Sequence, residues 1–116
     1  MHQRSERVAR QLLREISEIL QDRITGPRLG LVTVLHTDVS KDLRNAKIYY
    51  SVMGSQDQKK ATDLAIRRSV KHIKRSVNER LKLRYAMDVE LLRENAIDQS
   101  FRIDEILDEI RKEPKR

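Results

Sequence analysis

Side chains that could carry out acid–base or nucleophilic chemistry are scattered along this 116-residue chain. The three histidines, His2, His36 and His72, lie far apart, and none forms a cluster with Asp or Glu at metal-ligand spacing. The Ser-Lys-Asp stretch at 40–42 falls in an expected turn, where such side chains cap the backbone. The chain has no cysteine and no glycine-rich phosphate loop. The sequence therefore predicts no enzyme, no metal, no cofactor and no small-molecule substrate.

The basic residues offer a different chemistry, which is the binding of polyanions. The whole chain carries a net charge of +7, and residues 64–86, with eight basic residues and one acidic residue, contribute +7 on their own. Residues 1–63 add +3, and the rest of the chain adds −3. Such a concentrated positive field attracts phosphate-rich partners and weakens with added salt. A merely solvated helix face usually mixes both signs of charge, so the run RRSVKHIKR at 67–75 favours contact with nucleic acid.

Aromatic residues are few. Tyr49, Tyr50, Tyr85 and Phe101 are the complete set. Modules that read unpaired bases need exposed aromatic side chains on a platform. The composition therefore predicts that the protein reads nucleic-acid backbone and shape.

The hydrophobic pattern predicts the elements that position these side chains. Residues 5–24 carry a helical apolar stripe, and Pro27 with its flanking glycines ends that helix. Two alternating runs, 31–39 and 46–53, are joined by turn residues and predict an antiparallel hairpin. A third strand is expected at 87–92 and a last helix at 99–110, followed by a short flexible tail at 112–116.

The long segment that opens at Gly54 and Ser55 separates its apolar side chains from its basic ones. At 100° per residue, five of the apolar residues of 62–83 fall within about 80°, and six of its basic residues fall within about 120° on the other side. The five apolar residues are Ile66, Val70, Ile73, Val77 and Leu81, and the six basic residues are Arg67, Arg68, Lys71, Lys74, Arg75 and Lys82. Because the segment is long for so small a domain, we expect two helices with a bend near Ser69.

The expected order is helix, two strands, two helices, a strand and a last helix. It predicts an α+β two-layer sandwich, with the helices on one face of a three-stranded sheet, in a single domain over residues 1–111. This is also the order of the type II KH fold. KH domains clamp nucleic acid with a GXXG loop between two helices, but no glycine lies between residues 62 and 83. The ordinary KH mechanism is therefore excluded.

Three stretches of the chain resemble the ribosome-binding factor A family. Pro27-Arg28-Leu29-Gly30 is similar to that family's proline–arginine turn, and VSKDL with AKIY, at 39–43 and 46–49, is similar to its hairpin. LKLR at 81–84 resembles the basic end of its kinked helix. The resemblance runs from about Arg4 to Ile110 and depends on the order and spacing of the pieces.

This resemblance implies a type II KH-like domain in which a kinked helix with a short Ala-X-Gly motif replaces the GXXG loop. It also implies a non-catalytic, cytoplasmic, monomeric factor of ribosome biogenesis, important for growth in the cold. Such a factor binds the immature small ribosomal subunit and its rRNA and assists late maturation, including processing of the 5′ end of 16S rRNA. The sequence departs from the family at two places. Ser69-Val70-Lys71 stands at the Ala-X-Gly position, and Met87 stands where proline is common.

The expected RNA-binding residues are basic side chains of this region, namely Arg67, Arg68, Lys71, Lys74, Arg75, Lys82 and Arg84. Arg4 is expected to extend the patch, while Arg28 is either an RNA contact or a turn residue bonded to nearby carbonyls. No membrane is expected as a partner, because no apolar run approaches the ~20 residues that cross a bilayer.

Two other classes of function stay open at this point. A non-specific DNA-binding protein would use the same basic patch, because phosphates of DNA and RNA are alike to it. A protein–protein adaptor would use the acidic residues of the last predicted helix, which are Asp104, Glu105, Asp108 and Glu109.

Overall fold

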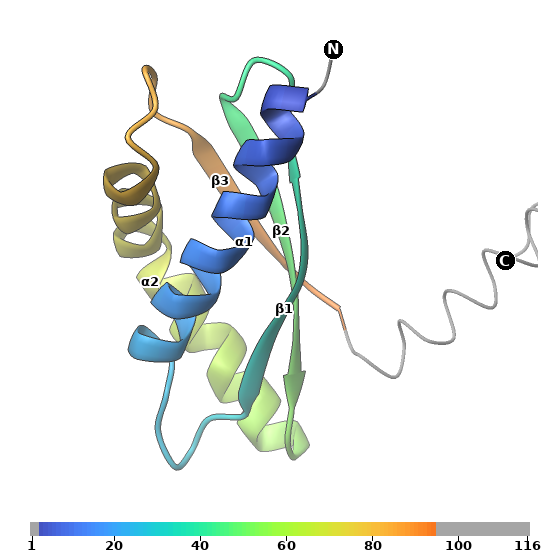
Figure 1. Cartoon of the computed structure of the whole chain (residues 1–116). Coiled ribbons are helices and arrows are strands. Elements are labelled where there is room, and N and C mark those ends of the chain that lie inside the picture. The colour runs from blue at the N-terminus through green and yellow to red at the C-terminus, as the bar shows by residue number, and fades with distance from the viewer. Residues whose placement is uncertain (1–2, 95–116) are drawn as a thin grey trace, which may run out of the picture.

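The computed structural model describes residues 3–94, which form two helices packed on one face of a three-stranded sheet (Figure 1). In chain order the elements are α1 (Gln3–Arg23), β1 (Leu31–Val39), β2 (Asn45–Met53), α2 (Gln56–Leu81) and β3 (Asp88–Arg93). The predicted α+β two-layer sandwich is confirmed. The helix predicted at 99–110 and the tail at 112–116 lie outside the described residues.

The sheet has the strand order β1-β2-β3. β1 and β2 form the predicted antiparallel hairpin, in which Leu31 pairs with Met53 and Val39 pairs with Ala46. β3 runs parallel to β2, with Asn45 opposite Asp88. A parallel pair needs a crossover connection, and α2 provides it. The crossover places α2 on one face of the sheet, and α1 packs on the same face against β1 and α2 (Figure 1).

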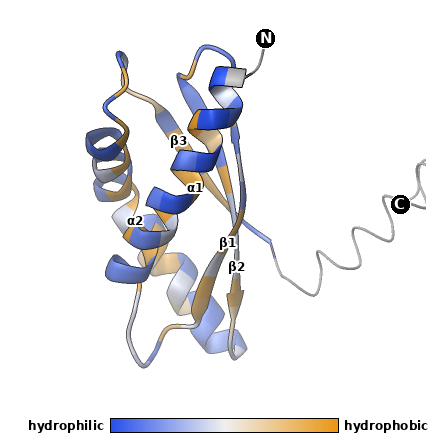
Figure 2. Cartoon of the chain, viewed as in Figure 1, coloured by the Kyte–Doolittle hydropathy of each residue, from blue (hydrophilic) through white to orange (hydrophobic). Residues whose placement is uncertain are grey.

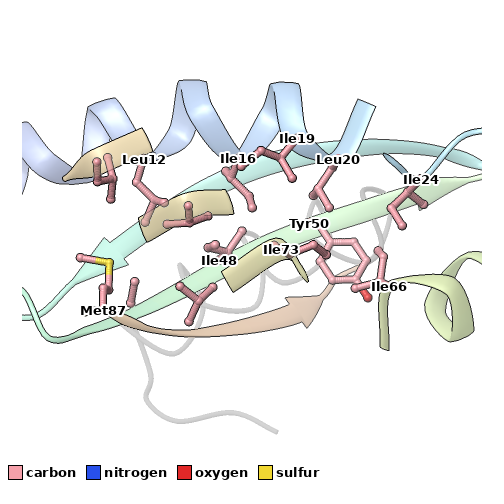
Figure 3. Packing of buried hydrophobic residues seen from close by; sticks show 14 of the residues in the cluster. Leu12, Ile16, Ile19, Leu20, Ile24, Ile48, Tyr50, Ile66, Ile73 and Met87 are labelled. Carbon is pink, nitrogen blue, oxygen red and sulfur yellow. The ribbon is translucent and has the colours of Figure 1, made fainter. Parts of the chain in front are cut away.

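The hydrophobic core lies between the helices and the sheet. Leu12 and Ile16 of α1, Ile48 of β2, Ile73 of α2 and Met87 have no exposed surface (Figure 3). Hydrophobic and hydrophilic stretches alternate along both helices (Figure 2), as expected for helices that bury one side only.

α2 is one helix where two consecutive helices were expected. It begins with a capping box, in which the Ser55 side chain accepts the Gln58 N–H and the Gln58 side chain accepts the Ser55 N–H. The helix then continues to Leu81. In Figure 1 its green first half and yellow second half run in different directions, so the change of direction occurs inside a continuous helix.

Lys71, which stands where the resemblance implies a glycine, causes no backbone strain in α2. Among the described non-glycine residues, only Leu43 and Lys82 have positive φ angles, so Lys71 has an ordinary helical backbone. The left-handed residue of this region is Lys82, with φ 51° at the C-cap, and its N–H bonds to the Asn78 carbonyl at 3.0 Å. The chain therefore turns sharply at the end of α2.

Asn78 ties the end of α2 to the start of β3. Its Oδ1 accepts the Met87 N–H at 2.7 Å, and its Nδ2 donates to the carbonyls of Met87 at 3.0 Å and Lys74 at 2.9 Å. A proline at position 87 would have no N–H and could not make this bond. Met87 has an N–H and donates it to Asn78 Oδ1. Met87 also fills the core, so the methionine at this position has a structural role.

Replacement of Asn78 by alanine should lower the free energy of unfolding by about 1–3 kcal/mol, because the polar groups of buried Met87 lose their partner. Urea denaturation measures this change. Glu79→Ala, on the exposed neighbouring residue, is the control and should change stability by about 0.5 kcal/mol or less. Equal stabilities of the two variants would contradict the role of Asn78.

Candidate nucleic-acid interface

The side of α2 that faces away from the core carries a row of basic side chains. Because Ile73 and Val77 are fully buried, residues on the opposite side of the helix point to solvent. Four of the predicted residues are exposed there, and we call them the α2 basic face: Arg67, Arg68, Lys71 and Arg75. Arg67, Lys71 and Arg75 follow one another at spacings of four, so their side chains lie on successive turns. No carboxylate of residues 3–94 lies within 4.0 Å of a charged nitrogen on this face.

Lys74 is also where the sequence predicted it, but it has an acidic partner. Its Nζ lies 2.7 Å from Oδ1 of Asp88, at the start of β3. The hydrogen bond from Lys74 holds the pKa of Asp88 below its usual value, so the Asp88 carboxylate is ionised at neutral pH. The side chains are 43% and 67% exposed, and such exposed pairs are weak. Lys74 can therefore leave Asp88 for a phosphate at small cost.

Arg80 belongs to a different surface. Its Nη1 lies 3.0 Å from Oε1 of Glu15 and 3.0 Å from Oε1 of Glu18, both on α1. The hydrogen bonds from Arg80 to these carboxylates raise the pKa of Arg80, and the bond to Glu15 has the largest effect. Arg80 was counted in the charge of residues 64–86, but its charge is used to join the two helices. The field of that segment is therefore weaker than its sequence implies.

Other predicted residues gather at the end of α2. Arg84 lies in the linker to β3 and, together with Arg4 of α1, lines a hollow of about 190 Å³. Lys82 is exposed at the C-cap of the helix. The structure thus brings Arg4 and Arg84 together, although they are far apart in the sequence.

Arg28 is separated from this group. Its turn, between α1 and β1, lies at the opposite end of the sandwich from the linker after α2 (Figure 1). The turn is held against α2 by the Gly30 N–H, which donates to Thr62 Oγ1 at 2.8 Å. A side chain at Gly30 would collide with the main-chain oxygen of Met53, which accounts for glycine there. Arg28 itself is exposed.

Two basic residues, one beside the α2 basic face and one near the linker after α2, were not predicted. Lys60 is exposed on α2 seven residues before Arg67, which is about two helical turns, and extends the α2 basic face toward the start of the helix. Helical periodicity places Lys60 on this face, but the residue lies outside the charged run at 67–75. Arg44, from the β1–β2 turn, lies over the ring of Tyr85, with 4.2 Å from its guanidinium carbon to the ring centre. No local pattern in the sequence could have shown this contact.

The described residues contain groups suited to binding anions rather than metals. Within residues 3–94, no three His, Cys, Asp or Glu side chains come together as a metal site. In the same part of the chain, no helix is long and apolar enough to span a membrane. A row of guanidinium and ammonium groups at helical spacing can contact successive phosphates of a nucleic acid.

Comparisons with known proteins agree with the resemblance seen in the sequence. The family described as ribosome-binding factor A matches residues 4–107. The ribosome-binding factor A of Geobacter metallireducens is 38% identical over 110 residues, covering 95% of this chain and 93% of that protein. That of Desulforamulus reducens is 36% identical over 110 residues, covering 95% and 92%.

Solved structures share the fold. The crystal structure of ribosome-binding factor A from Thermus thermophilus matches with a TM-score of 0.62 and 24% identity, covering 76% of this chain and 93% of that one. A homology model of the Thermus thermophilus factor, fitted into a cryo-EM map of a 30S complex, matches with a TM-score of 0.58 and 25% identity, covering 72% and 87%.

Replacement of Asp88 by asparagine should strengthen binding to RNA, because it frees Lys74 and removes one negative charge beside the α2 basic face. One added phosphate contact should steepen the slope of log K against log salt by about 0.7 to 0.9. Filter binding over a series of salt concentrations measures this. Glu90→Gln removes the same charge from an exposed residue of β3 and should have a smaller effect. If the two variants have the same slope, Asp88 does not hold Lys74 away from RNA.

Proposed function

The chain belongs to the ribosome-binding factor A family, and we propose on that basis that it binds the immature small ribosomal subunit through the α2 basic face. In this role it acts without catalysis, assisting late maturation of the subunit and the processing of the 5′ end of 16S rRNA. The relatives' names and the 30S complex of the Thermus protein support the partner. The α2 basic face supports the way in which this chain contacts it.

The observation that carries the proposal is the absence of acidic partners along the α2 basic face in residues 3–94. Elsewhere on the same helix the basic residues Lys74 and Arg80 do contact acids. Charges that contact no carboxylate are free to displace the counterions condensed on RNA when its phosphates bind. Arg67, Lys71 and Arg75 are thus available to phosphates without first breaking an ion pair of the described residues.

The rigid position of the basic face explains how binding can direct RNA folding. The side chains project from a helix whose other side is packed in the core, so the spacing of their Cα atoms is fixed. An rRNA conformation that presents phosphates at matching positions binds better than the alternatives. A factor that binds one conformation better shifts the population toward it, and this requires no chemical step.

Charge reversal on the α2 basic face should weaken small-subunit binding and leave the fold intact. In the double variant Lys71→Glu/Arg75→Glu, the loss of two phosphate contacts should flatten the salt dependence by about 1.4 to 1.8 in log–log slope. Co-sedimentation with purified small subunits at several salt concentrations measures both effects. The melting temperature should stay near that of the wild type, since both side chains are exposed.

The matched control is Arg10→Glu/Arg14→Glu on α1. It reverses two exposed arginines at the same spacing and changes the net charge equally. Equal binding losses in the two double variants would show that only net charge matters and would remove the basic face as the site. A wild-type protein that sediments with DNA but not with small subunits would contradict the proposed function itself.

A further inference from the structure

The end of the sandwich where the β1–β2 turn meets the linker after α2 carries a second cluster of basic side chains around an aromatic ring. Tyr85 is 52% exposed. The guanidinium carbon of Arg44 lies 4.2 Å from its ring centre, and that of Arg84 lies 5.6 Å away. Arg4, Arg84 and Tyr85 border the hollow of about 190 Å³, which Leu43 and Leu83 also line. This combination of an exposed ring, guanidinium planes and apolar walls is separate from the α2 basic face.

The backbone is strained on both sides of this cluster. Leu43, with φ 63°, precedes Arg44, and Lys82, with φ 51°, comes shortly before Arg84. These are the two non-glycine residues with positive φ among residues 3–94. That conformation is unfavourable for residues with a side chain, and it tends to persist at functional sites. With Leu43 in this conformation, its side chain is buried in the core and the side chain of Arg44 is exposed.

Hydrogen bonds hold the cluster in place. The Arg44 carbonyl accepts the Asp88 N–H at 2.8 Å, and the Arg44 N–H donates to Asp42 Oδ1 at 3.1 Å. The Ser40 hydroxyl donates to the same Asp42 oxygen at 2.7 Å. The Ser40 hydrogen bond, with that from Arg44, lowers the pKa of Asp42, so the carboxylate on the rim of the hollow is ionised at neutral pH. The site is therefore preformed, with one negative group beside its arginines.

We infer that this cluster binds an unpaired nucleotide of RNA, with the base stacked on the Tyr85–Arg44 pair and the adjoining phosphate held by Arg4 and Arg84. The inference rests on the proposed function, since it takes rRNA as the ligand, and it adds a contact that reads a single-stranded position. Bases stack on aromatic rings and on arginine planes alike. A phosphate alone would need no exposed tyrosine beside the arginines. The cluster adds the stacking of one base to the contacts with backbone and shape that the composition predicts.

The test compares Tyr85→Leu with Tyr85→Phe in the full chain. Short single-stranded RNA of random sequence is the probe, and a double-stranded RNA is the reference ligand. Tyr85→Leu should weaken single-stranded binding by about 5- to 150-fold, the usual effect of losing one stacked base, and should change duplex binding little. Tyr85→Phe keeps the ring and should bind like the wild type. In NMR spectra, the Tyr85 ring protons should shift upfield when single-stranded RNA is added.

A second pair of variants keeps the test independent of folding. Arg44→Lys keeps the charge but loses the planar group, and it should weaken single-stranded binding, while Arg10→Lys on α1 should not. If Tyr85→Leu melts at a lower temperature than the wild type, its loss of binding could come from unfolding. The affinity of Arg44→Lys and the NMR shift of wild-type Tyr85 then test the stacking site. Wild-type affinity in both Tyr85→Leu and Arg44→Lys, or no Tyr85 shift, would overturn the inference.

The outcomes separate this inference from the proposed function. Failure of the stacking site alone leaves Tyr85→Leu with normal single-stranded binding, while Lys71→Glu/Arg75→Glu still loses small-subunit binding. Failure of the proposed function leaves the wild type unable to bind small subunits at all. In that case the inferred rRNA contact falls with it.

Discussion

The packing of α2 against α1 and the sheet fixes the direction of every charged side chain on that helix. Ile73 and Val77 are completely buried, and this sets the rotation of the helix about its axis. The same rotation points Arg67, Lys71 and Arg75 to solvent and brings Arg80 to the carboxylates of α1. No described ion pair is needed to orient the exposed row. The electrostatic surface of the protein is therefore a consequence of its hydrophobic packing.

The elements that depend on local pattern could be predicted from the sequence. The hairpin, the α1 stripe and the separation of apolar from basic side chains on α2 follow from periodicities of two and 3.6 residues. The parallel pairing of β3 and the packing of both helices on one face agree with the expected order. The continuity of α2 was not predicted, because the expectation of two helices depended only on the length of the segment.

The contacts that could not be predicted join residues remote in sequence. Arg80 meets Glu15 and Glu18 only because α1 and α2 pack together, and Arg44 meets Tyr85 only because the β1–β2 turn reaches the linker after α2. The sequence also could not predict the backbone conformation of the lysine at the Ala-X-Gly position. Lys71 has no positive φ angle, and the left-handed residue of this region is Lys82, where α2 ends.

The parallel pairing of β2 with β3 also bears on how the chain folds. α1 and the β1–β2 hairpin can form from contacts near in sequence, but β3 can pair only after the whole α2 crossover has been made. During synthesis from the N-terminus, β2 therefore has one unpaired edge until residues 88–93 are available. Open strand edges pair readily with other chains, and contacts between distant segments form slowly. The interval between the synthesis of β2 and that of β3 is thus the period in which the nascent protein is most exposed to misassembly.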